Sequence, residues 1–255
     1  MAELNIIKIT TGGKRAMLLK GPSGVGKTFQ FRKLHEAGLK GLVADVEAKP
    51  ATIEDLDPDV FLLRALDVPT TPMEKQHMLA DGSSDFMRLV EYLRSDDHDY
   101  DFVYFDSLMR YADVLVDYLK DVRGLTGFDL WGALGKKMKI ALRMLVGLTS
   151  VEFPKPVHVI ATWGVEISTD WRGRRFEQPV IQGKMVTPWI DYMFDDVIRL
   201  AKEENAETGD VRFIAYTGGT GEFDAKVSSG AISLPQKIED PSIARIIEVL
   251  QSGKQ

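Results

Sequence analysis

The sequence reads Gly21-Pro22-Ser23-Gly24-Val25-Gly26-Lys27-Thr28 shortly after the apolar run Ala16-Met17-Leu18-Leu19. This stretch matches the pattern G-x-x-x-x-G-K-[ST] in full, between an expected short strand and an expected helix that starts near Phe29. Glycines in such a loop let successive backbone N–H groups point inward and form a nest for phosphate oxygens. The stretch therefore predicts a phosphate-binding loop, the P-loop, and with it a site for a nucleoside triphosphate.

The parts of the predicted P-loop have distinct expected contacts. Lys27 would reach the outer phosphates, and Thr28 would place its hydroxyl on Mg2+. The positive end of the following helix adds to the attraction for the anion. The residues predicted to contact the nucleotide are Gly21, Pro22, Ser23, Gly24, Val25, Gly26, Lys27, Thr28 and Phe29.

The composition of the 255 residues narrows the class of protein. A hydrophobic content of 44% can bury a substantial core. We expect one α/β domain over residues 1–255, with a nucleotide-binding core at 14–200 and a C-terminal hairpin and helix at 201–255. Cysteine is absent, which excludes disulfides and thiolate metal sites, and the four histidines lack ligand spacing. The net charge of −6 does not decide the partner, because a local basic stripe can bind nucleic acid on an acidic protein.

The sequence also bears on location. No apolar run approaches the length needed to cross a bilayer, and residues 1–13 lack the basic-then-apolar order of a signal peptide. We therefore expect a cytoplasmic protein without a membrane partner.

Apolar strands alternate with helical segments along the chain. The expected strands are 16–19, 41–47, 60–63, 101–107 and 157–163, and the expected helices include 84–94, 108–122, 130–148 and 241–251. The rest of 48–83 is interpreted as loop, and 196–200 with 211–216 as a hairpin. This order predicts a mostly parallel central sheet flanked by helices, with an antiparallel hairpin toward the C-terminus.

Acidic residues follow two of the expected strands. Glu47 closes the strand 41–47, and Asp106 ends the apolar run 102–105. Ligands of parallel sheets collect at the carboxyl ends of the strands, so both acids are expected beside the P-loop. Asp106 fits a Mg2+-associated acid, and Glu47 fits a base that polarises the attacking water, because Ser107 and not an acid follows Asp106. Two other interpretations stay open: Asp106 as a helix cap and Glu47 as a helix-start or surface acid.

Four motifs occur in a recognisable order. They are the P-loop, Leu-Val-Ala-Asp-Val-Glu at 42–47, Phe-Val-Tyr-Phe-Asp-Ser-Leu at 102–108, and a strand that ends in Ile160-Ala161-Thr162. This order resembles the RecA-like recombinase ATPases, and more closely their compact phage-encoded members, some of which act as single-strand annealing recombinases. Further short matches lie at 179–184, 194–200 and 225–226. The resemblance implies a RecA-like P-loop NTPase core that binds ATP and Mg2+ and whose ATP hydrolysis DNA stimulates.

The resemblance also implies roles for single residues. Asp106 would be the Mg2+-linked acid, and Glu47 would be the water-activating base. Thr162 would take the position of the γ-phosphate sensor at the end of its strand, where RecA has an amide side chain. Lys226 would lie at a subunit interface and reach the ATP of a neighbour, which implies a homo-oligomeric ring or filament.

In RecA-like proteins the segment after the sensor strand contacts DNA. Here that segment combines three arginines with two aromatic residues: Trp171, Arg172, Arg174, Arg175 and Phe176. Guanidinium groups bind phosphates, and aromatic faces stack on bases. We expect single-stranded DNA as a partner, and the resemblance suggests a single-strand binding protein as another. An exposed basic hairpin with ordinary surface charges explains the same residues equally well.

Two other functions fit a P-loop, which shows what is bound and not what is done with it. A small phosphotransferase (kinase) would use the three arginines as a lid over the transferred phosphate. A nucleotide-dependent regulator would bind other proteins and not DNA. Salt-sensitive binding of single strands favours the recombinase, product formation from a small acceptor favours the kinase, and neither result favours the regulator.

Overall fold

The computed structural model describes residues 13–46, 52–180, 189–205, 208–220, 223–228 and 234–252. The strands are β1 Ala16–Gly21, β2 Gly41–Asp45, β3 Asp59–Leu62, β4 Phe102–Asp106, β5 His158–Thr169, β6 Arg175–Pro179, β7 Asp196–Glu204, β8 Val211–Tyr216 and β9 Lys237–Glu239. The α-helices are α1 Phe29–Glu36, α2 Pro72–Asp81, α3 Asp85–Arg94, α4 Leu108–Asp121, α5 Gly127–Val146, α6 Ile190–Met193 and α7 Ile243–Ser252.

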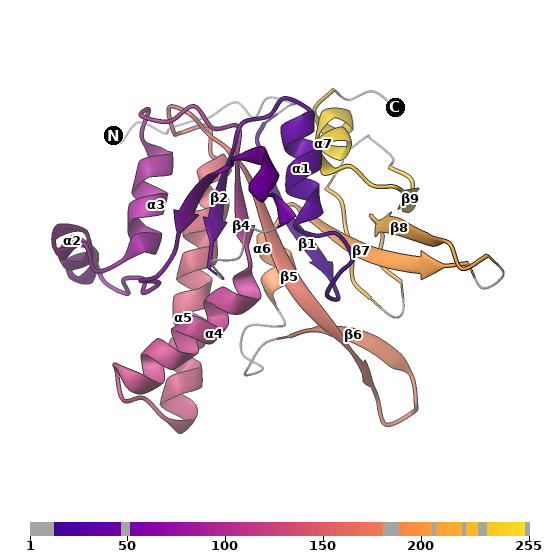
Figure 1. Ribbon diagram of the computed structural model, residues 1–255. Coiled ribbons are helices and arrows are strands. Elements are labelled where there is room, and N and C mark those ends of the chain that lie inside the picture. Colours follow the sequence, from indigo (N-terminus) through magenta and orange to yellow (C-terminus); the bar gives the residue numbers. More distant parts are fainter. Residues whose placement is uncertain are drawn as a thin grey trace, which may run out of the picture.

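These strands form one sheet, in the order β3-β2-β4-β5-β1-β7-β8-β9, and β6 pairs with β5 (Figure 1). The strands from β3 to β7 in this order are parallel, whereas β6, β8 and β9 pair antiparallel. The central parallel strands are apolar along their length because both of their faces are covered. The predicted α/β fold, with a mostly parallel sheet, flanking helices and an antiparallel hairpin near the C-terminus, is confirmed.

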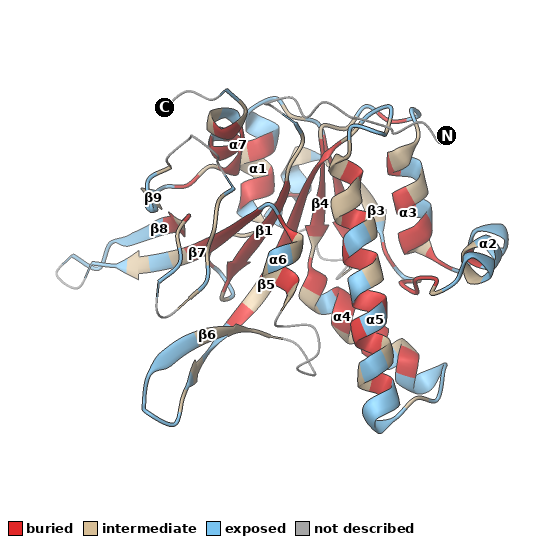
Figure 2. Ribbon diagram, turned by 180° about the vertical axis from the view of Figure 1, so that it is seen from behind, coloured by how far each residue is buried: buried red, intermediate tan, exposed pale blue. Residues whose placement is uncertain are grey.

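The sheet separates two hydrophobic cores. Helices α3, α4 and α5 cover one face, and α1 and α7 cover the other (Figures 1 and 2). Successive residues of β1 point to opposite faces: Leu18 packs in the first core and Leu19 in the second, and both are fully buried. Because β1 is held from both sides, the loop that follows it starts from a fixed position.

The helix α2 occupies part of the segment 48–83 that was predicted to be loop. The apolar periodicity of α2 is weak, because Met78 is the one buried residue among the ten residues of this helix. The start of α2 does carry a sequence cue: the side chain of Thr71 accepts a hydrogen bond from the backbone N–H of Glu74, and Pro72 takes the first helical position. The loop prediction was wrong here because it followed periodicity and passed over the cap.

The helix α5 is the longest described, and it begins three residues before the expected helix 130–148. It packs against α4 and the sheet, with Leu134, Met138 and Leu142 among its buried residues. None of the helices in the described ranges combines the length and the apolar character that a membrane span requires.

Candidate functional site

The loop between β1 and α1 has the backbone conformation of a phosphate nest. Gly24 and Gly26 have left-handed φ angles of 74° and 83°, a region in which a side chain is strained. Gly26 is also covered by the ring of Phe213, since a Cβ atom at Gly26 would lie 3.6 Å from the ring's Cδ1. The helix α1 begins directly after the loop, at Phe29, so its positive end points into the same space.

Lys27 lies along the loop that contains it. Its Nζ donates to the backbone oxygens of Gly21, at 2.8 Å, and Pro22, at 2.7 Å. The loop is also fastened to the sheet, because the hydroxyl of Tyr104 in β4 donates to the backbone oxygen of Lys27. Burial, and then the charge of Asp106, raises the pKa of Tyr104 well above its ordinary value, so the hydroxyl keeps the proton that it donates. The ammonium is thus placed where phosphate oxygens can replace the two carbonyl oxygens.

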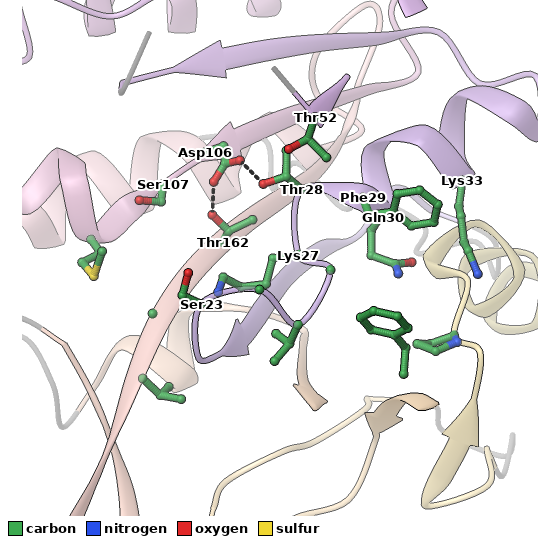
Figure 3. Close-up of a pocket in the computed structure, with 18 of the residues that line it drawn as sticks. Ser23, Lys27, Thr28, Phe29, Gln30, Lys33, Thr52, Asp106, Ser107 and Thr162 are labelled. Atoms are coloured by element: carbon green, nitrogen blue, oxygen red, sulfur yellow. Dashed lines mark hydrogen bonds between the residues drawn. The ribbon is translucent and has the colours of Figure 1, made fainter. Parts of the chain in front are cut away.

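Asp106 connects the P-loop to β5. Its Oδ2 accepts a hydrogen bond from Thr28 Oγ1 at 2.8 Å, and its Oδ1 accepts one from Thr162 Oγ1 at 2.6 Å (Figure 3). Asp106 ends β4, and β4 and β1 are the two parallel neighbours of β5. Three residues predicted from separate motifs therefore meet at one edge of the sheet.

The three residues border a pocket of about 840 Å3, within the roughly 300–1,000 Å3 of small-molecule sites. The predicted nucleotide-contacting residues from Ser23 to Phe29 all line it, while Gly21 and Pro22 supply the oxygens that Lys27 binds. The remaining lining residues are Gln30, Lys33, Asp45, Thr52, Asp106, Ser107, Met109, Thr162, Gly164, Val165, Val180, Phe213, Asp240 and Pro241.

The oxygen atoms of Thr28 and Asp106 fit a Mg2+ ion. Mg2+ prefers oxygen ligands and is usually held by one or two protein groups together with substrate phosphates and water. A hydroxyl and a carboxylate oxygen 2.8 Å apart are a donor set of this kind. Among the described residues, no cluster of three or more His, Cys, Asp or Glu side chains could hold a metal ion. The chemistry of this pair therefore suits an ion that arrives with a nucleotide.

A second carboxylate, that of Asp45, also lines the pocket. Asp45 ends β2, is buried, and stands opposite Asp106 in the register of β2 and β4. Glu47, the predicted water-activating base, lies outside the described residues. The acidic end of the strand 41–47 was the signal for both carboxylates, and the prediction selected Glu47 and missed Asp45.

The C-terminal part of the chain supplies lining residues that no motif predicted. Phe213 reaches the pocket from β8, and Asp240 and Pro241 reach it from the turn before α7. Their positions depend on the pairing of β8 with β7, and on the backbone hydrogen bond of 2.9 Å from Asp240 N to Phe213 O. Local sequence carries no sign of such pairing.

The predicted DNA-binding segment forms the tip of the β5–β6 hairpin, which extends from the body of the fold (Figure 1). Trp171 is 86% exposed, and the guanidinium carbon of Arg172 lies 4.4 Å from the centroid of its ring. Arg174 has a structural contact instead: its Nε donates to the carboxylate of Asp170 at 2.8 Å and so holds the turn. The tip therefore presents a stacked aromatic–arginine pair to solvent.

The base of this hairpin, and not its tip, lines the pocket. Gly164 and Val165 of β5 are among the lining residues, whereas none of the five residues predicted to bind DNA is. Arg175 and Phe176 open β6, opposite Thr169 and Ser168 of β5, and Figure 2 shows this end of the hairpin as mainly exposed. In this structure the three arginines therefore do not line the pocket.

Lys226 is fixed through its backbone to β7. Its N–H donates to Val197 O at 2.9 Å, and Val197 N–H donates to Lys226 O at 2.7 Å. The side chain is half-buried and does not line the pocket of its own chain. A contact with the nucleotide of a neighbouring subunit stays a prediction.

A protein-family model matches most of the chain. Residues 13–229 match the AAA_24 family, described as an AAA domain. A search of curated proteins gave no match. Similar solved structures include a KaiC-like protein from Pyrococcus horikoshii OT3, with 15% identity, a TM-score of 0.40 and coverage of 80% of this chain and 79% of that one. They also include the flagellar accessory protein FlaH from Methanocaldococcus jannaschii, with 13% identity, a TM-score of 0.41 and coverage of 91% and 88%.

Proposed function

The chain belongs to the AAA_24 family of AAA domains, and we propose that it binds and hydrolyses ATP and acts on single-stranded DNA, in recombination or annealing of the phage type. The proposal of ATP hydrolysis is supported by the contacts of Thr28 and Thr162 with the two oxygens of Asp106, in the pocket that the P-loop lines. The exposed pair of Trp171 and Arg172 supports the DNA partner.

The residues of the pocket have different roles in the proposed hydrolysis. The loop N–H groups and Lys27 bind the phosphates. Thr28 and Asp106 would hold Mg2+, which would supply positive charge beside the phosphate oxygens. Thr162 contacts the γ-phosphate from β5. A carboxylate takes a proton from the attacking water, whose oxygen bonds to the γ-phosphorus as the bond to the β-phosphate oxygen breaks, giving ADP and phosphate. We propose Glu47 for this carboxylate, with Asp45 as the described alternative in the pocket.

Two conservative variants separate these carboxylates. If Glu47 activates water, Glu47→Gln lowers kcat at least about 100-fold, in the range of general-base catalysis, and leaves the ATP dissociation constant unchanged. Asp45→Asn then has the smaller effect on kcat. A larger loss of kcat in Asp45→Asn than in Glu47→Gln would assign the base to Asp45.

The DNA proposal is tested by ATP hydrolysis with and without single-stranded DNA over a salt series. The test variant is Arg172→Gln/Arg175→Gln, which spares Arg174 because that side chain holds the turn. The matched control is Arg88→Gln/Arg245→Gln, which removes the same charge from exposed positions on α3 and α7. Both proteins should keep the basal rate, since none of the four arginines lines the pocket.

We expect DNA to raise the hydrolysis rate of the wild type and the control, and the hairpin variant to lose that response. Because phosphate contacts release counterions, the variant should also show a shallower dependence of DNA binding on salt, by about one unit of slope per arginine contact removed. Equal stimulation of the hairpin and control variants would contradict the hairpin contact. Absence of DNA binding at low salt, with hydrolysis intact, would leave an ATPase with a different partner.

A homo-oligomer with Lys226 acting across the interface is part of the same proposal, as is a cytoplasmic location, which suits a chain without cysteine. Lys27→Ala should remove nucleotide binding from its own site, and Lys226→Ala should impair the site of a neighbour. Each variant alone would be inactive, and mixing the two would restore part of the hydrolysis through interfaces that combine an intact pocket with an intact Lys226. No recovery in the mixture would contradict the role of Lys226.

A further inference from the structure

A second and smaller cavity lies among the start of α2, the end of α4 and the middle of α5. Its volume is about 180 Å3, and none of its described lining residues belongs to the nucleotide pocket. The helix α4 starts two residues after Asp106 and runs toward the cavity for 14 residues, or about 21 Å at 1.5 Å per residue. Figure 2 shows the three helices at the opposite end of the molecule from β8 and β9. The cavity is therefore a site separate from the P-loop.

Positive charge is in excess in this cavity. It is lined by one carboxylate, that of Glu74, and by three cations, Arg123, Lys136 and Lys137. Lys137 is 6% exposed, and its ammonium is paired with the carboxylate of Asp67. Buried charges are tolerated in proteins when they are paired, and Asp67 provides the pair for Lys137. Glu74 balances one of the other two cations, so one positive charge remains.

The carboxylate of Glu74 is already bound by donors of its own chain. Its Oε2 accepts hydrogen bonds from the hydroxyl of Thr70 at 2.6 Å and from the backbone N–H of Thr70 at 2.7 Å. These bonds lower the pKa of Glu74, so the side chain is ionised at neutral pH. Glu74 therefore fixes the start of α2 against the cavity and needs no ligand.

Two of the cations still offer donors. The guanidinium of Arg123 is hydrogen-bonded to the hydroxyl of Tyr118, and a guanidinium has five N–H donors in all. In the ranges that the structure describes, the exposed ammonium of Lys136 has no acceptor. A guanidinium and an ammonium that line one cavity are a donor set for a carboxylate. The unpaired positive charge is thus placed where a ligand can reach it.

The rest of the lining is apolar and the space is small. Leu119 is fully buried, and Leu125 and Ala133 are half-buried. Water occupies about 30 Å3 per molecule in the liquid, so the cavity holds on the order of six groups of that size. Sites for drug-sized ligands start at roughly 300 Å3. The cavity therefore suits a short apolar group and not a whole nucleotide.

We propose that this cavity binds a monocarboxylate with a short apolar group, whose carboxylate contacts Arg123 and Lys136 and whose apolar part packs on Leu119 and Leu125. A single negative charge matches the one positive charge in excess. A phosphate monoester carries about 1.5 to 2 negative charges at pH 7 and would leave excess negative charge beside Glu74. A free carboxylic acid and the C-terminal residue of a peptide share the proposed chemistry.

The test uses N-acetyl-leucine, which has one carboxylate and one apolar side chain, and N-acetyl-leucinamide, which has nearly the same shape without the charge. Ligand-observed NMR titration of the full chain measures the two dissociation constants. Lys136→Gln removes the unpaired ammonium, and Ala133→Leu fills the cavity without a change of charge. The matched control is Lys139→Gln, which removes one charge from an exposed position of α5 outside the cavity. Lys27→Ala tests whether the probe binds at the P-loop instead.

The wild type should bind N-acetyl-leucine with a Kd on the order of 1 mM, as expected for a ligand of about a dozen heavy atoms. The amide should bind at least about tenfold more weakly, because it lacks the charge that Arg123 and Lys136 attract. Lys136→Gln and Ala133→Leu should each weaken binding of the acid at least about tenfold, while Lys139→Gln and Lys27→Ala should stay within about twofold. Thermal unfolding checks that the three α5 variants are folded.

A hexapeptide, Gly-Ser-Gly-Ser-Gly-Leu, distinguishes the two sources of the carboxylate. If the peptide with a free C-terminus binds at least about tenfold more tightly than N-acetyl-leucine, and its amidated form does not, the natural ligand is a protein C-terminus. Affinity equal to or below that of N-acetyl-leucine would identify a free carboxylic acid.

Three results would overturn the carboxylate site. They are the absence of wild-type binding up to about ten times the expected Kd, equal binding of the acid and the amide, and unchanged affinity in both Lys136→Gln and Ala133→Leu. A loss of binding in Lys27→Ala would move the probe to the P-loop and would reject the site as well. All of these results concern the cavity alone, and the proposed ATP hydrolysis would stand or fall by its own tests.

Discussion

Thr28 and Thr162 donate hydrogen bonds to different oxygens of one carboxylate, that of Asp106, at 2.8 and 2.6 Å. One threonine belongs to the P-loop and the other to β5, so the carboxylate is oriented from two sides before any ligand binds. A carboxylate with both oxygens held in this way loses little rotational freedom when it takes up its ligand, which is a form of preorganisation.

Replacing Thr162 tests that orientation. In Thr162→Val the side chain keeps its volume in a fully buried position but loses the donor to Asp106 Oδ1. We expect kcat for ATP hydrolysis to fall by at least about tenfold, because the hydroxyl orients Asp106 and is the proposed contact with the γ-phosphate. ATP affinity should change less, since the P-loop that binds most of the triphosphate is unaltered. Steady-state kinetics at several Mg2+ concentrations measures both quantities. Thr162→Ser, which keeps the hydroxyl, should retain most of the activity, and a loss equal to that of the valine variant would contradict this role.

Tyr104 offers a test of how the P-loop is fastened. In Tyr104→Phe the backbone oxygen of Lys27 loses its hydroxyl donor inside the core. The free energy of unfolding should fall by about 1 kcal/mol, the typical net value of one hydrogen bond, and ATP affinity should fall with it. Urea denaturation and nucleotide titration measure the two effects. The hydrogen bond would be shown to be unimportant if both quantities stayed at the wild-type level.

A buried ion pair joins the hairpin to β7. Arg199 Nε donates to Glu177 Oε2 at 2.5 Å, and both side chains are 9% exposed. Glu177→Gln leaves a buried guanidinium without its counter-charge, so we expect unfolding to become easier by about 3–5 kcal/mol. The double variant Arg199→Met/Glu177→Leu removes both charges and should be far closer to the wild type. Chemical denaturation of the wild type, the single variant and the double variant measures these differences. If the single variant were as stable as the double variant, the unpaired guanidinium would not be destabilising.

His158 makes the stability of the fold depend on pH. The side chain is buried, and its Nδ1 accepts a hydrogen bond from Arg15 N at 3.0 Å. Burial, and then the charge of Lys14, lowers the pKa of His158 from 6.5 to about 3. Between pH 6.5 and pH 3, His158 is protonated in the unfolded chain but neutral in the folded chain. The free energy of unfolding is therefore unaffected by His158 above about pH 6.5, and it decreases as the pH falls toward 3.

The matching variant is His158→Asn, whose side-chain oxygen can accept the same N–H. The free energy of unfolding should fall more steeply with acidification in the wild type, by up to about 1.4 kcal/mol per pH unit relative to the variant. Because the carboxylates are common to both proteins, the difference between the two curves isolates the histidine. Parallel curves from about pH 7 to pH 4 would show that folding does not lower the pKa of His158.

The parts of the site that local sequence determines could be predicted. The P-loop has all of its determinants within one short stretch, so Lys27 and Thr28 followed from the pattern alone. Asp106 followed from a general property of parallel sheets, whose strands bring their carboxyl ends to one edge, and Thr162 followed from the resemblance to RecA-like ATPases. The order of the strands in that sheet then placed the two residues together.

The parts that depend on long-range pairing could not be predicted. Phe213 reaches the P-loop only because β8 pairs antiparallel with β7 in one register, and a shift by one residue would turn its side chain to the other face. Asp240 is fixed by a backbone bond to Phe213 and by Lys33, far away in the sequence. The start of α2 is a different case, since its cap was visible in the sequence and only its weak periodicity concealed it.

The strand β5 is continuous over twelve residues, from the neighbourhood of Asp106 to the turn of the hairpin. At roughly 3.3 Å per residue, the stretch from Thr162 to Thr169 measures about 23 Å. No loop interrupts this stretch, so a single strand paired with β6 connects Thr162 to the tip of the hairpin. The pocket and the aromatic–arginine tip therefore lie along one strand, with Thr162 at the carboxylate of Asp106 and with Trp171 and Arg172 just past the last residue of β5.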